Sequence, residues 1–350
     1  MTGRFWRIVG VVTVWHIAAS VCYYAVYAGT PLFRDAFELS GLEIGVVVAA
    51  LTLGYAVFLL PFGVATDRFG EHRTLTGGLA GVALGVLAVA VAPTYPWLLV
   101  AAFLLGSMYG SATPGTNKAI FDRIDPERQH RAIGIKQVGP TVGSAVGAVL
   151  VTGLAGAFLW QSGFLVAAVV GLTTAVGFFL VYRGAEGVEA TSPDCPGLLS
   201  NRTYVVLLPA GICLGGAFYT TTGYTVLFVE ESVGATVATG GLVLAALQVA
   251  SSAGRVGAGT LADVLPGAPR VRTSSVLVVQ AAGGGILYLM LPLAGTTLAA
   301  SAVFVGLGLF VPPTFGYLVD TSGYPAAWGF LGGLSFVAAG LVLLAAFEDV

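Results

Sequence analysis

Charged side chains are scarce in this sequence. Its 350 residues include 15 Lys and Arg and 17 Asp and Glu, which together make up 9% of the chain. Soluble domains carry about 25% charged residues, so this chain lacks the polar surface that a water-soluble protein needs. A mean hydropathy of +0.91 points the same way. A soluble globular protein is therefore excluded, and no nucleic-acid partner is expected.

Reactive side chains are equally sparse. The three cysteines, Cys22, Cys195 and Cys213, are scattered without metal or redox spacing, and we interpret them as small apolar fillers. The sequence contains no P-loop signature, so ATP is not the expected energy source. No metal-ligand cluster and no nucleophile–base pairing is evident. We therefore expect no metal, no cofactor and no enzymatic activity.

Long apolar runs dominate what is present. About 20 apolar residues in a helix span the hydrocarbon core of a bilayer. Eleven candidate runs lie near residues 8–29, 42–65, 74–92, 96–116, 132–157, 160–182, 203–228, 236–262, 273–293, 297–318 and 325–347. The first run is too long for a cleavable signal peptide. The sequence predicts an all-α polytopic membrane protein with the lipid bilayer as its surroundings.

The distribution of basic residues predicts the orientation. Lys and Arg accumulate in cytoplasmic loops. With the N-terminus inside, fourteen of the fifteen basic residues lie on the cytoplasmic side, and only Arg34 lies outside. We expect a multi-pass protein of the plasma membrane with a cytoplasmic N-terminus.

The most distinctive motif joins the second and third runs. The segment 63–73 reads Gly-Val-Ala-Thr-Asp-Arg-Phe-Gly-Glu-His-Arg. It resembles the loop between the second and third helices of major facilitator superfamily transporters. The resemblance implies a secondary transporter with two helical bundles, in which this loop is a cytoplasmic latch. The corresponding residues here are Gly63, Asp67, Arg68, Gly70 and Arg73.

Single residues of this loop have expected roles of their own, and a simpler interpretation of its charges is also possible. His72 stands where the family has a basic residue, which predicts a pH-dependent latch. Gly63 is expected to permit close helix approach, and Asp67 to satisfy backbone N–H groups at a helix N-terminus. The simpler interpretation is that these charges only fix the topology.

A second copy of the motif divides the chain. Gly259 and Asp263 repeat Gly63 and Asp67 after 196 residues, with Val264 in place of Arg68 and Arg255 one turn earlier as a substitute charge. Parallel repeats of this kind build the two halves of the superfamily. We predict an N-terminal six-helix bundle at 1–183, a cytoplasmic linker at 184–202 and a C-terminal bundle at 203–350.

The second half is short for this family. Residues 297–309 resemble the start of a tenth helix, and 314–324 resemble the end of an eleventh, with the part between them missing. Pro312 and Pro313 at the junction would kink or break one continuous helix. Eleven spans with a fused tenth helix are favoured, which leaves the side of the C-terminus open. The loss predicts a weakened outward-facing state.

The fifth run carries a second family-like motif. Gly139, Pro140 and Gly143 resemble a glycine–proline motif of the fifth helix in exchangers, although a tightly packed, kinked helix explains them equally. Lys136 and Gln137 just before it are candidates for substrate contact. The alternative is that Lys136 extends to the interface.

Few other ionisable groups lie inside the runs. His16 is the main candidate for proton coupling, although a neutral, hydrogen-bonded histidine is the alternative. No Asp or Glu lies in the middle of a run. Tyr23, Tyr219 and Gln248 are further solute candidates, and tyrosines of an interfacial belt are the alternative, above all for Tyr27 and Tyr224.

These features favour a secondary active transporter that works by alternating access. Its partners would be a small solute, with an organic or inorganic anion favoured, and protons or a counter-substrate. We expect a monomer. The alternative is a non-transporting, degenerate carrier or a sensor with the same fold.

Overall fold

The computed structural model describes residues 2–183, 215, 219–266, 269–293, 296, 297, 299, 337 and 340. Its regular elements are helices, and no strand occurs among these residues. The chain divides into two compact units. Unit 1 comprises Met1–Phe37 and Val47–Ser192, and unit 2 comprises Glu38–Val46 and Pro193–Val350. Each unit is described by itself.

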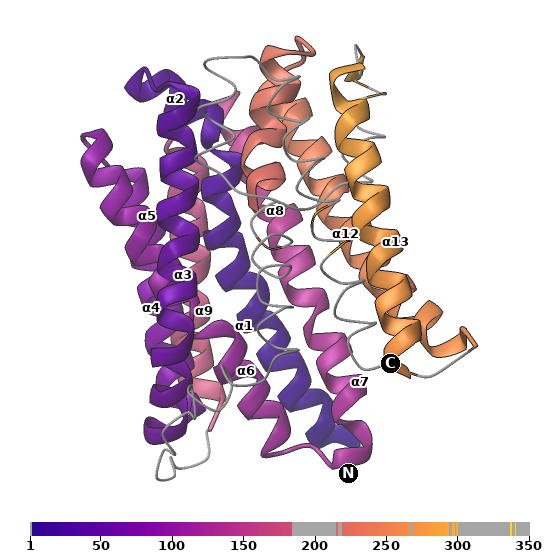
Figure 1. Cartoon of the computed structure of the whole chain (residues 1–350). Coiled ribbons are helices and arrows are strands. Elements are labelled where there is room, and N and C mark those ends of the chain that lie inside the picture. Colours follow the sequence, from indigo (N-terminus) through magenta and orange to yellow (C-terminus); the bar gives the residue numbers. More distant parts are fainter. Residues whose placement is uncertain are drawn as a thin grey trace. The chain divides into compact units, whose positions relative to one another are not determined.

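Unit 1 is a bundle of membrane-length helices (Figure 1). Its elements are α1 (Thr2–Ala28), α2 (Thr30–Phe37), α3 (Gly41–Phe69), α4 (Glu71–Ala90), α5 (Tyr95–Tyr109), α6 (Ala112–Phe121), α7 (Pro126–Lys136), α8 (Val138–Ala155) and α9 (Ser162–Val181). All of these except the short α2 form six helices that are long and apolar enough to cross a membrane, with α5 and α6 joined in one and α7 and α8 in another. The first six predicted spans and the all-α membrane fold are thereby confirmed.

Two of the six spans are interrupted one turn before a proline. Pro114 lies in the first turn of α6, and the break from α5 is at Gly110–Ser111. Pro140 lies in the first turn of α8, and the break from α7 is at Gln137. A proline lacks an N–H group, and its ring collides with the carbonyl four residues earlier. That carbonyl belongs to Gly110 in one span and to Lys136 in the other. Each helix is therefore interrupted at or directly after the residue whose carbonyl the proline ring would meet.

Small residues bring α1 and α8 together, side by side in Figure 1. A Cβ atom on Gly143 would lie 2.6 Å from Ser20 Cβ and would also collide with the Ile17 carbonyl oxygen. A Cβ on Gly147 would lie 2.8 Å from the Val21 carbonyl oxygen. Glycine therefore permits a helix approach that a larger residue would prevent.

Buried side chains attach the outer helices to α1. The Trp15 indole Nε1–H donates to the Leu75 carbonyl of α4 over 2.9 Å. The Cys22 thiol is buried and lies 3.2 Å from the Ala167 carbonyl of α9. Cys22 thus has the filler position predicted for it, whereas Cys195 and Cys213 lie outside the described residues.

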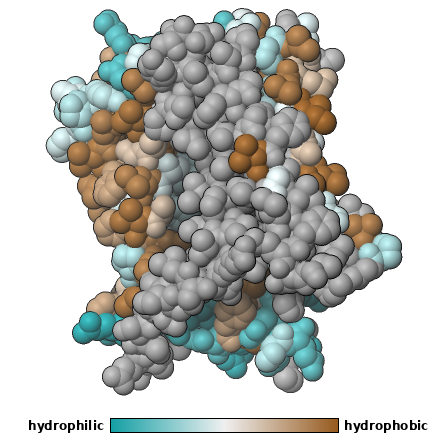
Figure 2. All heavy atoms as spheres, viewed as in Figure 1, coloured by the Kyte–Doolittle hydropathy of each residue, from teal (hydrophilic) through white to brown (hydrophobic). Residues whose placement is uncertain are grey.

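The outer flank of unit 1 is apolar. Exposed aliphatic side chains include Leu53 and Leu60 of α3, Leu84 of α4 and Val100 of α5. Figure 2 shows brown side chains along this left flank, with teal ones at its two ends. An apolar band between polar ends is what a bilayer requires of a spanning bundle.

Unit 2 contains a helical segment at 219–231, α12 (Val237–Val264), α13 (Pro269–Met290) and the short 3-10 helix η1 (Leu291–Leu293). These positions agree with the predicted spans at 236–262 and 273–293. The junction at Pro312, the linker at 184–202 and all but residues 297, 299, 337 and 340 of the last two predicted spans lie outside the described residues. The shortened second half and the domain boundaries remain predictions.

The start of α3 belongs to unit 2 and has a capping box. The Ser40 backbone N–H donates to Glu43 Oε2 over 2.9 Å, and the Glu43 N–H donates to Ser40 Oγ over 3.3 Å. Each side chain thus satisfies a backbone group that the helix leaves free. The Tyr224 hydroxyl donates to the Gly41 carbonyl over 2.6 Å, which ties 219–231 to this helix start.

Candidate functional site

Lys136 ends α7 and is buried, with 2% of its surface exposed. Its ammonium donates to Asn117 Oδ1 over 2.8 Å and to Thr116 Oγ1 over 3.2 Å, and both acceptors belong to α6. Within the described part of the chain no carboxylate lies at ion-pair distance from it. The structure therefore contradicts the alternative that Lys136 extends to the interface. A buried cation held only by neutral groups is costly, so it marks a functional candidate.

His16 lies on α1, and 4% of its surface is exposed. Its Nδ1 atom is buried and has no hydrogen-bond partner among the described residues. Gly139 makes room for it, because a Cβ there would lie 2.9 Å from His16 Cβ. Gly139 follows Lys136 by three residues, so His16 packs against the span that carries Lys136, about one turn further along. The alternative of a fully hydrogen-bonded histidine does not hold at Nδ1.

Four tyrosines form an aromatic cluster beside His16, whose ring centroid lies 6.3 Å from that of Tyr109. The rings of Tyr23 and Tyr109 stack with centroids 4.1 Å apart and an interplanar angle of 11°. The ring centroids of Tyr55 and Tyr109 lie 5.6 Å apart, and the Tyr23 and Tyr27 hydroxyls are 3.2 Å apart. The Tyr109 hydroxyl also lies 2.9 Å from Ser20 Oγ of α1. The sequence singled out Tyr23 but missed Tyr55 and Tyr109, because no local pattern brings α1, α3 and α5 together.

The interfacial-belt interpretation is wrong for two tyrosines. Tyr27 and Tyr224 both have 0% exposure, and each has a hydrogen-bonded hydroxyl. A belt tyrosine keeps its hydroxyl in the wet headgroup region. Gln137, in contrast, is exposed at the junction of α7 and α8.

Unit 2 has a polar cluster of its own. Thr221 Oγ1 and the Tyr288 hydroxyl lie 2.7 Å apart, and both residues are buried. Gln248 of α12 is 2% exposed, and its Nε2 atom has no partner in the described part of the chain. Tyr219 is half-buried. Two predicted candidates thus lie in the helices that carry this cluster, while Tyr288 was missed.

The motif at 63–73 contributes an exposed ion-pair network. Lys118 of α6 lies 3.4 Å from Asp67 and 3.2 Å from Asp122. Half of the Asp67 side chain is exposed, so this pair contributes little stability. The predicted role of Asp67 as a helix cap is not observed, because no side chain caps the N-terminus of α4. Arg68 and Arg73 are exposed, and the Arg68 guanidinium lies 5.5 Å from the Phe69 ring centroid.

The two glycines of this motif have different roles. Gly70 precedes α4 with φ 83° and ψ 154°, a conformation that is essentially restricted to glycine. The prediction that Gly63 permits a close helix approach is wrong, since a Cβ there would meet no described atom within 4 Å. Gly63 therefore permits no close approach among the described helices. Arg255, Gly259 and Asp263 lie within α12, but their side chains are outside the described residues.

Within the motif, Glu71 is fully buried and is held by one charged and one neutral side chain. Arg123 approaches Glu71 Oε1 to 3.2 Å, and the Tyr182 hydroxyl donates to the same oxygen over 3.1 Å. The Arg123 guanidinium lies 5.1 Å from the Tyr182 ring centroid. Burial, and then the charge of Glu71, raises the pKa of Tyr182, which keeps it a hydrogen-bond donor. No local pattern predicts this contact, because Arg123 and Tyr182 are 52 and 111 residues away from Glu71 in the chain.

The comparisons with known proteins agree with this architecture. The family model of the Major Facilitator Superfamily matches residues 12–315. A hexuronate transporter of Bacillus subtilis is 29% identical over 174 residues, 50% of this chain and 41% of that protein. A 3-(3-hydroxy-phenyl)propionate transporter of Escherichia coli is 29% identical over 253 residues, 70% of this chain and 60% of that protein. The chain thus spans about half the length of these curated relatives.

Solved structures share the fold at low sequence identity. A bacterial homologue of the human lysosomal transporter Spinster, inward-facing and unoccupied, has a TM-score of 0.72 at 16% identity. That match covers 99% of this chain and 80% of the other. A mutant of the nucleoside transporter NupG has a TM-score of 0.76 at 12% identity and covers 97% of this chain and 100% of the other.

Proposed function

Because the chain belongs to the Major Facilitator Superfamily, we propose that it is a secondary transporter of a small organic carboxylate. The observation that carries the proposal is Lys136, a buried ammonium whose described partners are the neutral side chains of Thr116 and Asn117. A carboxylate would supply the missing negative charge through a charge-assisted hydrogen bond. A neutral or cationic solute would leave the cost of burying Lys136 uncompensated.

The names of the relatives support the same chemical class. Hexuronate, 3-(3-hydroxy-phenyl)propionate and, in a probable transporter of Escherichia coli that is 25% identical over 161 residues, L-galactonate are the solutes in their names. All three are carboxylates that also carry hydroxyl groups. A site with one buried cation and several hydroxyl donors is chemically suited to such molecules.

The tyrosine cluster supplies the second half of the proposed site. Stacked rings at Tyr23 and Tyr109 offer a flat apolar face, and their hydroxyls offer hydrogen bonds. His16 adds a titratable group whose Nδ1 has no described partner. We assign His16 to coupling, because it is a buried titratable side chain that packs against Gly139, one turn after Lys136 in the same span. Proton symport is then the expected mode, and exchange for a second carboxylate is the alternative.

The ion pair of Asp67 with Lys118 is assigned to the conformational latch. Half of the Asp67 side chain is exposed and the pair is long at 3.4 Å, so a change of state breaks it at little cost. Gly70 sets the direction of the chain into α4 and thereby places the loop. Asp67 is therefore expected to influence the balance of conformations rather than the folding of unit 1.

The test is solute binding to the purified full chain, followed by counterflow in proteoliposomes. Hexuronate, galactonate and 3-(3-hydroxyphenyl)propionate are compared with a neutral hexose and with the amide of the aromatic acid. The proposal expects thermal stabilisation by at least one carboxylate, none by the neutral analogues, and counterflow of the bound acid. Binding without counterflow would favour a non-transporting carrier. Stabilisation by the neutral analogues alone would contradict the carboxylate assignment.

A further inference from the structure

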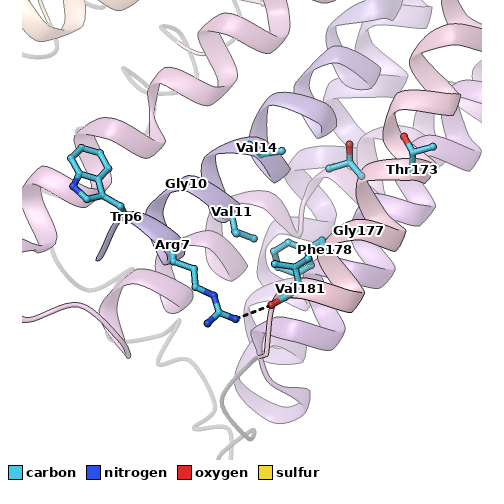
Figure 3. A pocket seen from close by; sticks show the side chains of 10 residues that line it. Trp6, Arg7, Gly10, Val11, Val14, Thr173, Gly177, Phe178 and Val181 are labelled. Atoms are coloured by element: carbon cyan, nitrogen blue, oxygen red, sulfur yellow. Dashed lines mark hydrogen bonds between the residues drawn. The ribbon is translucent and has the colours of Figure 1, made fainter. Parts of the chain in front are cut away.

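A groove runs between α1 and α9 on the surface of unit 1. It has a volume of about 540 Å³. Its lining is almost wholly apolar and includes Val14 of α1 and Val181 of α9, which are 55% and 51% exposed. Figure 3 shows these side chains along the two helices, with Arg7 at one end. The groove is therefore apolar along its length, is open on the outer surface of the spanning helices and ends at the Arg7 guanidinium.

Two glycines, one on each helix, leave space in the groove because they have no side chain. Gly10 of α1 and Gly177 of α9 both line it. A Cβ added at either position would meet no described atom within 4 Å. The space beside them is therefore open, and a larger side chain at either position would occupy the groove instead of disturbing the described packing.

The polar end of the groove has the chemistry of a headgroup site. Arg7 is exposed, and its only hydrogen bond among the described residues is a long one, from Nη2 to the Val181 carbonyl oxygen over 3.4 Å. No described carboxylate pairs with it. Trp6 beside it is 51% exposed, and the Arg131 guanidinium lies 5.7 Å from its ring centroid. Tryptophan and basic side chains gather at the membrane interface, where they meet lipid headgroups.

We propose that this groove binds an anionic phospholipid, with an acyl chain between α1 and α9 and the phosphate on Arg7. The apolar lining matches the chain, and the guanidinium matches the phosphate in charge and in its paired donors. Clustered basic residues beside spanning helices favour anionic lipid. With the predicted cytoplasmic N-terminus, the lipid belongs to the inner leaflet. This site is independent of the solute, so its test requires no transport.

Lipid retention by the full chain provides the test. The protein is purified with mixed phosphatidylglycerol and phosphatidylcholine, and bound lipid is counted by native mass spectrometry. We expect the unmodified chain to retain phosphatidylglycerol with about fivefold preference, the effect of one basic residue near the surface. Arg7→Gln should abolish the preference, and Gly177→Leu should reduce retention of both lipids.

A matched control separates groove filling from a general effect of leucine. Gly77 of α4 is also exposed, with no described atom within 4 Å of an added Cβ, so Gly77→Leu should leave retention unchanged. Thermal unfolding of each variant checks that it is folded. Equal preference in Arg7→Gln and the unmodified chain would overturn the proposal. So would a dimer that Gly177→Leu dissociates without any change in lipid, since the groove would then hold a second copy.

Discussion

At the scale of single residues, the motif at 63–73 combines positions of different physical character. Asp67 was recognisable from its spacing, and its exposed ion pair fits a switchable contact. Glu71, four residues later, is fully buried against Arg123 and Tyr182. Sequence reasoning could not separate the two carboxylates, because their burial depends on residues far away in the chain. Asp67 and Glu71 are thus four residues apart in the same motif, but one carboxylate is half exposed and the other is fully buried.

This contrast gives a prediction about two carboxylates. Glu71→Gln leaves the largely enclosed Arg123, whose side chain is 19% exposed, without this counter-charge and should cost up to about 3–5 kcal/mol of stability. Asp67→Asn removes an exposed pair and should cost less than about 1 kcal/mol, while it shifts the conformational equilibrium. Thermal unfolding in detergent measures the first effect, and cysteine accessibility from both sides of the membrane measures the second. Equal losses of stability would contradict the assignment of Glu71 to structure and Asp67 to the latch.

The two glycines of the motif give a second prediction. Gly70→Ala places a side chain at φ 83° and should destabilise the protein by about 1–3 kcal/mol. Gly63→Ala, in the interior of α3 with open space beside it, should be neutral or stabilising by up to about 1 kcal/mol. Thermal unfolding of both variants checks the difference. A larger loss of stability for Gly63→Ala than for Gly70→Ala would contradict this prediction and would support a close helix approach at Gly63.

At the scale of elements, the apolar runs predicted the six spans of unit 1 because bilayer thickness fixes their length. The interruptions also have a sequence origin, since Pro114 and Pro140 each follow a break by one turn. The partners of the helices were not predictable in the same way. The meeting of Tyr23, Tyr55 and Tyr109 requires α1, α3 and α5 to converge, and no periodicity within one helix encodes that.

The packing of α1 on α8 gives a prediction at this scale. Gly143→Leu would force a side chain into the space of Ser20 and the Ile17 carbonyl, and overpacking costs about 1–3 kcal/mol or more. Gly153→Leu, on the same helix with no described atom within 4 Å, is the matched control and should change stability little. Thermal unfolding distinguishes them. If Gly143→Leu were as stable as the control, the contact between these helices would not be as close as described.

At the scale of the whole molecule, family membership was predictable from one loop and its echo 196 residues later. Solute identity was not, because it depends on side chains that the fold gathers from separate helices. Lys136 shows why. Its position near the end of a run suggested contact with the interface, yet the break before Pro140 ends α7 at Lys136, whose side chain is buried against α6.

The most direct test of the carboxylate assignment is the affinity of the full chain for a bound carboxylate before and after Lys136→Gln. We expect Lys136→Gln to lower the affinity about tenfold or more, the effect of one hydrogen bond to a charged group. Arg128→Gln, at an exposed basic residue of α7, is the control and should change the affinity less than about twofold. Equal affinity in Lys136→Gln and the unmodified chain would contradict the central claim.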